Sequence, residues 1–264
     1  MSRVLITGAT GFVGGQILAA GRAQNIPMRL VLRPGWQAKT GPLPPDCEVV
    51  ETGDLFAESK EWWQQTCEGI DTIIHSAWYT EHGKYLTSPR NTDCLIGTLR
   101  MAQGAALAKV RRFVGVGTCI EYQLGDQILT PDTPLAPTTV YGQAKAAAFF
   151  ALSGFFHTSG GEFLWCRIFQ PYGEGENPQR LYPYVHSCLS QGKPVDLGSG
   201  KQVRDFIDVK EAGANILTHA LGKRQGAINI CSGVPRSIRD FVTAIAESYG
   251  RSDLLRFGAR DDNP

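Results

Sequence analysis

The sequence predicts an α/β fold in which a doubly wound parallel sheet is joined to a smaller C-terminal α/β lobe. Short apolar runs alternate with amphipathic segments at a steady interval through residues 4–168. These runs are apolar on both faces, which is typical of parallel strands covered by helices on both sides. The first run ends in a glycine-rich turn that leads into a helix, the arrangement of a Rossmann-type nucleotide-binding domain.

Strands and helices are expected to alternate along the first part of the chain. A strand at residues 4–7 precedes a helix at 12–22, and the Pro- and Gly-rich segment 34–46 is expected to be a loop. Further strands are expected at 28–32, 47–50, 70–75, 112–116 and 162–168, with helices through 62–63 and over 90–108 and 139–157.

After residue 170 the alternation becomes less regular, because prolines and glycines interrupt it. We therefore expect a dinucleotide-binding domain at 1–169 and an interwoven substrate-binding lobe at 170–264, which closes over the cofactor. Short helices are expected in that lobe near 181–191, 209–221 and 238–249, and short strands at 202–207 and 227–231.

Composition excludes several classes of protein. The 26 basic and 25 acidic residues give a formal net charge of +1, which predicts no nucleic acid and no membrane surface as a partner. The most apolar stretch, residues 144–156, is too short to span a bilayer. The seven cysteines are scattered without a CxxC pair, and the histidines form no ligand cluster. We therefore expect reduced thiols, no metal and a cytoplasmic protein, since a first strand near Arg3 leaves no room for a signal peptide.

The stretch TGATGFVG at residues 7–14 predicts a phosphate-binding turn. Gly8, Gly11 and Gly14 lie between a strand and a helix, where missing side chains let a pyrophosphate approach the backbone. The open N–H groups and positive dipole end of the helix then attract the anion. The alternative is a plain turn between a strand and a helix.

A second motif, YGQAK at residues 141–145, predicts proton transfer. The phenol of Tyr141 and the ammonium of Lys145 lie one helical turn apart on one face. A nearby cation favours tyrosinate and lowers a tyrosine pKa from about 10 toward the working pH. Tyr141 could then exchange a proton with a carbonyl or alcohol while hydride moves to or from a nicotinamide. Thr118, at the end of a strand, could hydrogen-bond the same oxygen.

Taken in order, the motifs resemble those of the extended short-chain dehydrogenases/reductases, the family of nucleotide-sugar epimerases, dehydratases and 4-ketoreductases. The resemblance covers nearly the whole chain, and the fixed order of the motifs makes it specific. It is carried by TGATGFVG at 7–14, GDL at 53–55, HSA at 75–77, Thr118, YGQAK at 141–145, RIFQPYG at 167–173, RDFIDV at 204–209 and INICSG at 228–233.

The resemblance implies a catalytic set of Thr118, Tyr141 and Lys145, with Lys145 also holding the nicotinamide ribose. It further implies residues that flank the adenine or meet the substrate diphosphate, where a guanidinium suits phosphate oxygens. The expected cofactor-binding residues are Gly8, Thr10, Gly11, Phe12, Val13, Gly14, Arg33, Asp54, Leu55, Ala77, Tyr141 and Lys145, and the expected substrate-binding residues are Thr118, Cys119, Gln170 and Arg204.

Departures from the family pattern narrow the expected activity. Dehydratases of this family carry Asp-Glu directly after the catalytic Thr, whereas this chain has Cys119 and Ile120, which cannot remove water. Cys119 is one position away from the catalytic cysteine of the epimerase-reductases, so we interpret it as a small residue at a strand end. Cys94 and Gln170 stand where the family usually has asparagine.

The cofactor prediction depends on Arg33. An acidic residue at the end of the second strand would bind the ribose hydroxyls and favour NAD. Arg33 instead offers a cation where a 2′-phosphate would lie, so NADP(H) is preferred and NAD(H) is the second choice. The alternative is a solvated loop arginine.

Together these features favour NADPH-dependent reduction of the 4-keto group of a nucleotide-linked 6-deoxyhexose, with Tyr141 as proton donor. A nucleotide-sugar 4-epimerase that retains NAD is one alternative, and a non-catalytic nucleotide-binding or redox-sensing protein is another. The resemblance also implies a homodimer formed through the helices near 90–108 and 139–158. Relatives continue past the equivalent of 254–258 with a further helix, so the chain ending at Pro264 is expected to be truncated or to have a short lobe.

Overall fold

The computed structural model describes residues 3–262 and divides the chain into two compact units. The first unit contains Met1–Ile168 and Lys210–Ile230, and the second contains Phe169–Val209 and Cys231–Pro264. The expectation about the end of the chain at Pro264 lies outside the described residues.

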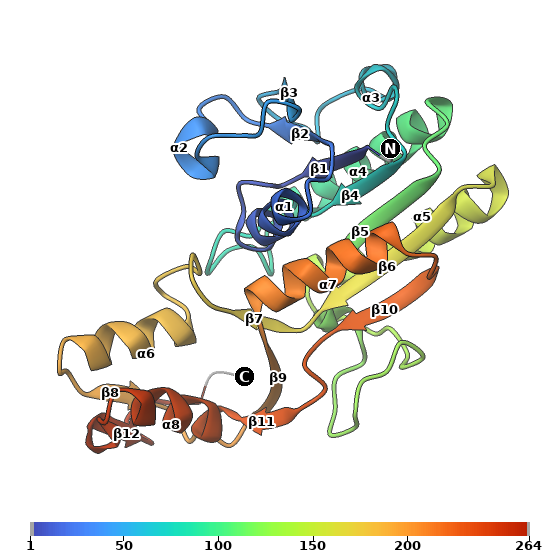
Figure 1. Cartoon of the computed structure of the whole chain (residues 1–264). Helices are drawn as coiled ribbons and strands as arrows, with labels where there is room; N and C mark the ends of the chain where they lie inside the picture. Colours follow the sequence, from blue (N-terminus) through green and yellow to red (C-terminus); the bar gives the residue numbers. More distant parts are fainter. Residues whose placement is uncertain (1–2, 263–264) are drawn as a thin grey trace. The chain divides into compact units, whose positions relative to one another are not determined.

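The first unit is built on a seven-stranded sheet with the strand order β10-β6-β5-β4-β1-β2-β3 (Figure 1). All six pairings between neighbouring strands are parallel, so the predicted doubly wound α/β fold is confirmed. The strands are β1 (Val4–Thr7), β2 (Met28–Leu32), β3 (Glu48–Glu51), β4 (Thr72–His75), β5 (Arg112–Thr118), β6 (Glu162–Ile168) and β10 (Gly226–Ile230).

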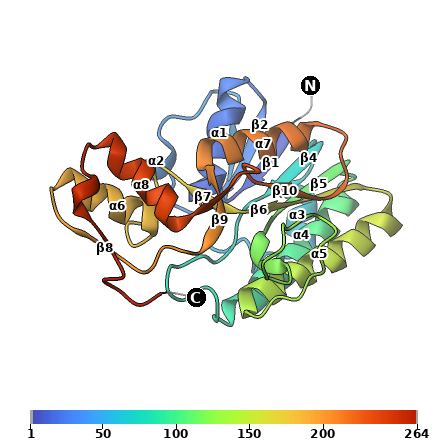
Figure 2. The same cartoon turned by 90° about the horizontal axis from the view of Figure 1, so that it is seen from below.

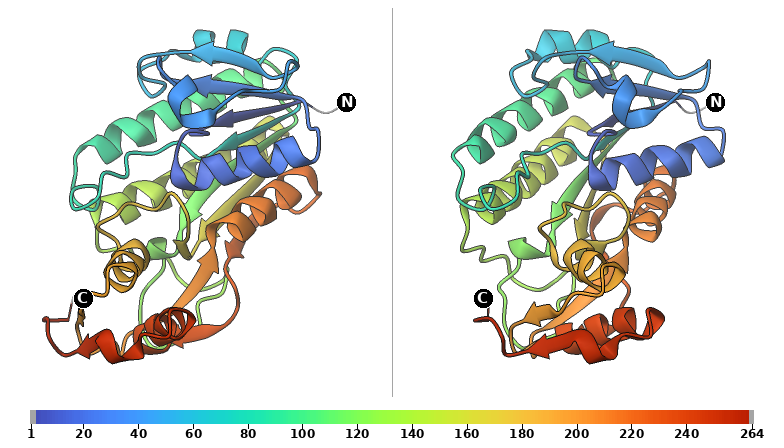
Figure 3. Two further views of the ribbon diagram at one scale, coloured as in Figure 1. Left: turned by 60° about the vertical axis from the view of Figure 1, so that its left-hand side comes forward. Right: turned by 90° about the vertical axis from the view of Figure 1, so that its left-hand side faces the viewer.

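Helices cover both faces of this sheet, as its apolar strands require. Helices α1 (Phe12–Ala23) and α7 (Val209–Leu221) lie on one face, and α3 (Lys60–Thr66), α4 (Arg90–Leu107) and α5 (Val140–Ser159) lie on the other (Figure 2). Helices α4 and α5 run side by side (Figure 3). The segment 34–46, expected to be a loop, contains the one-turn helix α2 (Gln37–Thr40).

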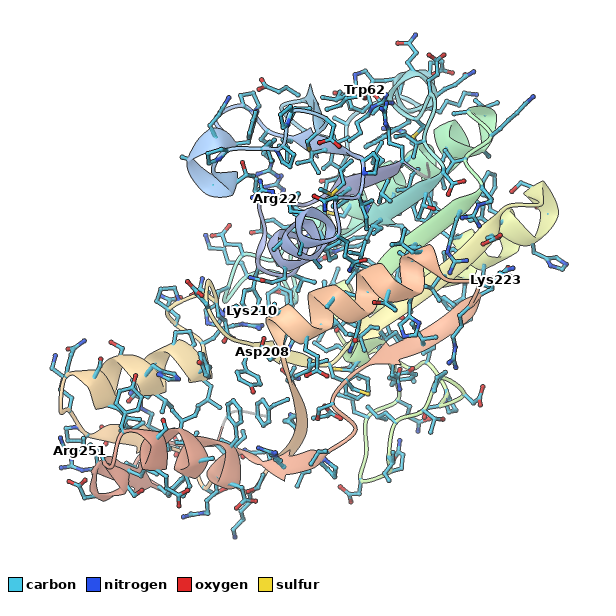
Figure 4. The ribbon with its side chains drawn as sticks, in the orientation of Figure 1. Arg22, Trp62, Asp208, Lys210, Lys223 and Arg251 are labelled. Carbon is cyan, nitrogen blue, oxygen red and sulfur yellow. The ribbon has the colours of Figure 1, made fainter. Side chains whose placement is uncertain are left out.

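Large aromatic side chains fill the core between the sheet and helices α3–α5. Trp63 is completely buried and packs against Gly104 of α4, where a Cβ would lie 2.4 Å from the Trp63 Cβ. Its neighbour Trp62, labelled on α3 in Figure 4, packs edge-on against it with ring centroids 4.9 Å apart. The tandem tryptophans therefore serve packing at the core and its edge.

The second unit has its own small sheets and core. Strands β11 (Pro235–Ser237), β9 (Val203–Asp208) and β7 (Gln170–Tyr172) form one sheet, and β12 (Leu255–Phe257) pairs with β8 (Val195–Leu197). Helices α6 (Leu181–Ser190) and α8 (Ile238–Ser248) and the short 3₁₀ turn η2 (Ser252–Leu254) complete the unit, and a second 3₁₀ turn, η1 (Cys119–Glu121), belongs to the first unit. The core includes Phe206, whose ring stacks on Phe241 with a centroid distance of 3.9 Å.

The observed units differ from the predicted division between residues 169 and 170 mainly in the assignment of one segment. Residues 210–230 belong to the first unit, although the sequence predicts them in the C-terminal lobe. The reason is that β10 continues the large sheet beside β6, with Ile228 and Ile230 buried.

No helix within residues 3–262 is long and apolar enough to cross a membrane.

Candidate active site

The turn after β1 is compact because its glycines touch other backbone segments. Gly8 has a φ of +76°, and a Cβ there would lie 2.7 Å from the Ala77 backbone nitrogen. At Gly14 a Cβ would lie 2.1 Å from the Gly8 carbonyl oxygen, and the Gly11 N–H donates to that same oxygen at 2.9 Å. Side chains at positions 8 and 14 would therefore force the turn open.

The N-terminus of α1 is left open for an anion. Its N-cap residue is Gly11, which supplies no side-chain cap, and the first turn contains no acidic residue. Helix N–H groups without a capping side chain are a suitable binding site for a pyrophosphate. Thr10, Phe12 and Val13 line this turn and are half-buried.

The other expected cofactor residues follow neighbouring strands of the same sheet. Arg33 is exposed directly after β2, and Ala77 is buried after β4, where its N–H donates to the Thr7 hydroxyl at 3.4 Å. After β3, Asp54 is exposed and accepts the Phe56 N–H at 3.0 Å, and Leu55 is buried. All of these residues lie at the carboxyl edge of the parallel sheet, where ligands of such folds bind.

Thr118 and Tyr141 are brought together by the start of α5. Thr139 caps this helix, since its hydroxyl accepts the Gly142 N–H at 3.1 Å. The Tyr141 N–H donates to the Leu86 carbonyl at 3.1 Å, and its ring packs edge-on against Tyr85 at 4.9 Å. The Tyr141 phenol is thereby placed to share a side-chain hydrogen bond with Thr118 at the end of β5.

The environment of Tyr141 differs from the expected one. Burial raises the pKa of Tyr141 above its ordinary value, the charges of Tyr85 and Glu121 raise it further, and only the Thr118 hydrogen bond lowers it. The expected lowering of the Tyr141 pKa by Lys145 was wrong, because burial dominates the shift and the Lys145 ammonium contacts the Val116 carbonyl and the Trp78 ring. The phenol of Tyr141 is therefore protonated at neutral pH.

Lys145 lies one turn after Tyr141 and is 3% exposed. Its Nζ donates to the Val116 carbonyl at 2.7 Å and lies 3.8 Å from the centre of the Trp78 ring. Burial lowers the pKa of Lys145 to about 7, although the charges of Glu121 and Cys94 oppose this shift. The side chain can therefore gain or lose a proton near neutral pH.

His75 forms a bridge inside the sheet. Its Nδ1 lies 2.8 Å from the Thr7 hydroxyl, and its Nε2 lies 2.8 Å from the Thr98 hydroxyl. Burial and the charge of Lys145 lower the pKa of His75 to about 3, so the imidazole is neutral in the folded protein. Both ring nitrogens are used, which makes His75 a structural group that joins β1, β4 and α4.

The expected substrate residues lie in both units. Cys119 is buried next to Thr118 in the first unit. Gln170 and Arg204 lie in the second unit, on the paired strands β7 and β9, where Gln170 is opposite Phe206. Arg204 is exposed, and its Nη1 donates to the Val203 carbonyl at 2.9 Å.

Three residues near Tyr141 and Lys145 were missed from the sequence: Tyr85, Trp78 and Glu121. Tyr85 and Trp78 carry no signal, since a single aromatic residue in a loop has many uses. Glu121 had a signal that could have been used, because it follows Thr118 at the Thr-x-x-Glu spacing of a capping box.

The parallel sheet and glycine turn define a Rossmann-type α/β protein. Residues 4–231 match the model of the NAD dependent epimerase/dehydratase family, so the chain belongs to that family.

Individual relatives are similar at low identity. The chain is 23% identical to dTDP-6-deoxy-L-talose 4-dehydrogenase (NAD(+)) of Aggregatibacter actinomycetemcomitans, covering 95% of this chain and 91% of that protein. It is 26% identical to GDP-6-deoxy-D-mannose reductase of Pseudomonas aeruginosa, covering 93% and 79% of the two chains. The structure of UDP-N-acetylglucosamine 4-epimerase from Methanobrevibacter ruminantium M1, at 20% identity, has the same fold, with a TM-score of 0.87 over 100% of this chain and 86% of that chain.

The buried state of His75 predicts acid sensitivity. Because its pKa is about 3 when folded and about 6.5 when unfolded, the unfolded chain binds one more proton between these values. The free energy of unfolding should therefore fall as the pH drops from 6.5 toward 3, at about 1.4 kcal/mol per pH unit from this group. In urea titrations at several pH values, His75→Gln should remove this part of the slope. The exposed His157→Gln should keep it, and equal slopes in His75→Gln and the wild type would contradict the account.

Proposed function

We propose that the protein is an NAD(P)-dependent oxidoreductase that reduces the 4-keto group of a nucleotide-linked 6-deoxyhexose at C4. The observation that carries this proposal is the buried, protonated Tyr141, hydrogen-bonded to Thr118 at the carboxyl edge of the sheet. The names of two relatives, a 4-dehydrogenase and a reductase of nucleotide-linked 6-deoxysugars, support the substrate class.

The proposed chemistry uses each group in the state that its surroundings favour. The nicotinamide, when bound, supplies the hydride. Thr118 orients the carbonyl oxygen of the substrate, and Tyr141 donates a proton to that oxygen as it becomes a hydroxyl. Burial favours this direction, because it raises the pKa of Tyr141 and keeps the phenol protonated. Lys145 is proposed to hold the nicotinamide ribose, as the family resemblance implies.

The residues of the glycine turn fit a dinucleotide. The uncapped start of α1 offers backbone N–H groups to a pyrophosphate, and Gly8 and Gly14 keep the backbone free of side chains. We propose Asp54, Leu55 and Ala77 as further cofactor contacts. Arg33 is exposed and makes no ion pair within residues 3–262, which supports NADP(H) as the preferred cofactor. NAD(H) is the alternative, since the name of one relative specifies NAD(+).

The second unit is proposed as the substrate-binding lobe. Arg204 is exposed on β9, and its guanidinium suits the diphosphate of a nucleotide sugar. Gln170 and Cys119 are proposed as further substrate contacts. Dehydration is not proposed, because Cys119 and Ile120 supply no acid and base pair.

The proposed activity is tested by screening 4-keto-6-deoxyhexoses linked to dTDP or GDP, with NADPH and NADH side by side. Oxidation of NADPH that depends on the keto-sugar is the expected result. Purified protein with tightly bound NAD and no net cofactor oxidation would instead identify a 4-epimerase. Absence of turnover on every sugar would favour a non-catalytic nucleotide-binding protein.

Removal of the Tyr141 hydroxyl should abolish most of the activity. Tyr141→Phe is expected to lower kcat by about a hundredfold to ten-thousandfold, the usual contribution of a general acid. Steady-state kinetics with the keto-sugar measures this loss. The matched control is Tyr122→Phe, another buried tyrosine, whose hydroxyl instead donates to Asn229 at 2.6 Å. A Tyr141→Phe variant with wild-type turnover would refute the assignment.

Replacement of Arg33 should change cofactor selection. Arg33→Ala is expected to raise the KM for NADPH by about tenfold to a hundredfold, because a hydrogen bond to a charged group contributes about 1.5–3 kcal/mol. The KM for NADH should stay within about twofold, since NADH has no 2′-phosphate. Lys39→Ala, at an exposed basic residue of α2, controls for general electrostatic attraction. No effect of Arg33→Ala on either KM would identify a solvated loop arginine, and equal losses with both cofactors would contradict a contact with the 2′-phosphate.

We also propose a homodimer formed through α4 and α5. Ile96 is 43% exposed, Leu107 is 51% exposed and Phe150 is 61% exposed on these two helices, so a partner packed there would cover apolar side chains. Sedimentation analysis should give a dimer that Phe150→Glu dissociates. A wild-type protein that sediments as a monomer at all concentrations would remove this proposal.

A further inference from the structure

Glu121 is a completely buried acid at the end of η1, three residues after Thr118, the last residue of β5. Its carboxylate accepts the Thr118 backbone N–H at 2.8 Å and the Trp165 indole N–H at 3.0 Å. The Arg167 Nε donates to the same carboxylate at 2.7 Å. This carboxylate therefore has partners on β5 and β6, and one of those partners is the backbone of a proposed catalytic residue.

Arg167 is itself 1% exposed and is held on both sides. Its guanidinium carbon lies 4.5 Å from the centre of the Phe149 ring and 4.8 Å from that of Tyr122. Burial of two charges costs several kcal/mol per ion, and replacing such a pair by apolar residues is often neutral or stabilising. Stability alone is therefore a weak explanation for the Glu121–Arg167 pair.

The network leaves Thr118 little freedom. The Thr118 hydroxyl accepts the Ile120 N–H at 3.3 Å, and together with the Glu121 carboxylate it forms a reciprocal capping box. The preceding Gly117 lies directly on the network, since a Cβ there would be 2.5 Å from the Glu121 Oε1. The Thr118 backbone is thus held by the Glu121 carboxylate, and the Thr118 hydroxyl by the Ile120 N–H.

We propose that Glu121 is a positioning residue: held by Arg167 and Trp165, its carboxylate fixes Thr118 and thereby orients the Thr118–Tyr141 pair that receives the substrate oxygen. This inference rests on the proposed function, because that function gives the pair its role. Glu121 does not itself exchange a proton with the substrate.

The charge of Glu121 also acts on Lys145. The ionisable groups that face Lys145 are Glu121 from η1, Cys94 from α4 and His75 from β4. Burial lowers the pKa of Lys145, and the negative charge of Glu121 opposes this shift. Loss of that charge should lower the Lys145 pKa further and leave the amine neutral at pH 7.

A first test needs no substrate. Full-length protein labelled with ¹³C at the lysine side chains is titrated by NMR, with Lys145→Met used to assign the signal. In Glu121→Gln, Lys145 should titrate at a pH lower by about half a unit or more, since removing an opposite charge disfavours the ammonium. The Thr118 amide proton should also shift upfield, because its acceptor is no longer charged.

The matched control is Glu162→Gln. Glu162 pairs with another buried arginine, Arg112, at 2.7 Å, but at the start of the strands rather than at their carboxyl edge. The Glu162→Gln variant should be less stable than the wild type but should show the same Lys145 titration and the same Thr118 amide shift. The inference is overturned if Glu121→Gln folds and both signals match those of Glu162→Gln.

Kinetics then separates positioning from a purely structural role. Glu121→Gln should lower kcat by about tenfold or more, because misplacing a reacting group costs rate rather than affinity. The KM for the keto-sugar and the KM for NADPH should both stay within about twofold of the wild-type values. The pH dependence of kcat should shift in the direction of the Lys145 titration. A loss of activity explained entirely by a lower folded fraction would overturn the inference.

A second variant covers the case in which Glu121→Gln does not fold, since that change leaves the Arg167 charge buried and unpaired. Glu121→Gln combined with Arg167→Met removes both charges, and the same signals and rates are measured; wild-type values would overturn the inference.

If the wild type reduces no keto-sugar, the proposed function fails, whereas the Lys145 titration and the Thr118 amide still decide whether Glu121 acts on them.

Discussion

The packing of α5 against β5 and β6 buries the phenol of Tyr141 and the ammonium of Lys145, and the chemistry of the site follows from this burial. Tyr141 is only 8% exposed, so its charged form is disfavoured and the phenol stays protonated. Lys145, deprived of water, depends on the Val116 carbonyl and the Trp78 ring and titrates near neutral pH. The packing of α5 thus shifts the pKa values of both groups away from their values in water.

The sheet and the proposed catalytic set could be predicted from the sequence because both depend on local patterns. Apolar runs report strands buried on two faces, and the i, i+4 spacing of Tyr141 and Lys145 fixes their common helix face. Gly8 and Gly14 are glycines for a reason that is visible in the sequence only as spacing: they touch the backbones of Ala77 and Gly8. For Tyr141 and Lys145, sequence distance is a sufficient guide to spatial arrangement.

The features that could not be predicted all depend on contacts between distant residues. The sign of the Tyr141 shift is set by burial and by Tyr85, whose position in a loop is not encoded by any period. The pairing of Glu121 with Arg167 joins residues 46 positions apart. The return of β10 to the large sheet likewise depends on its pairing with β6, and its short apolar run alone does not reveal the partner. Strands of three residues such as β8 and β12 are too short for a detectable alternation.

The central claim, that the residues at the carboxyl edge of the sheet serve hydride transfer to C4 of a sugar, is tested most directly with deuterated cofactor. The full-length protein is incubated with NADPH that carries deuterium at C4 of the nicotinamide and with a dTDP-linked 4-keto-6-deoxyhexose. Our account predicts deuterium at C4 of the sugar, in one configuration, after transfer from one face of the cofactor. Cofactor oxidation without deuterium in the sugar, or deuterium at another carbon, would contradict it.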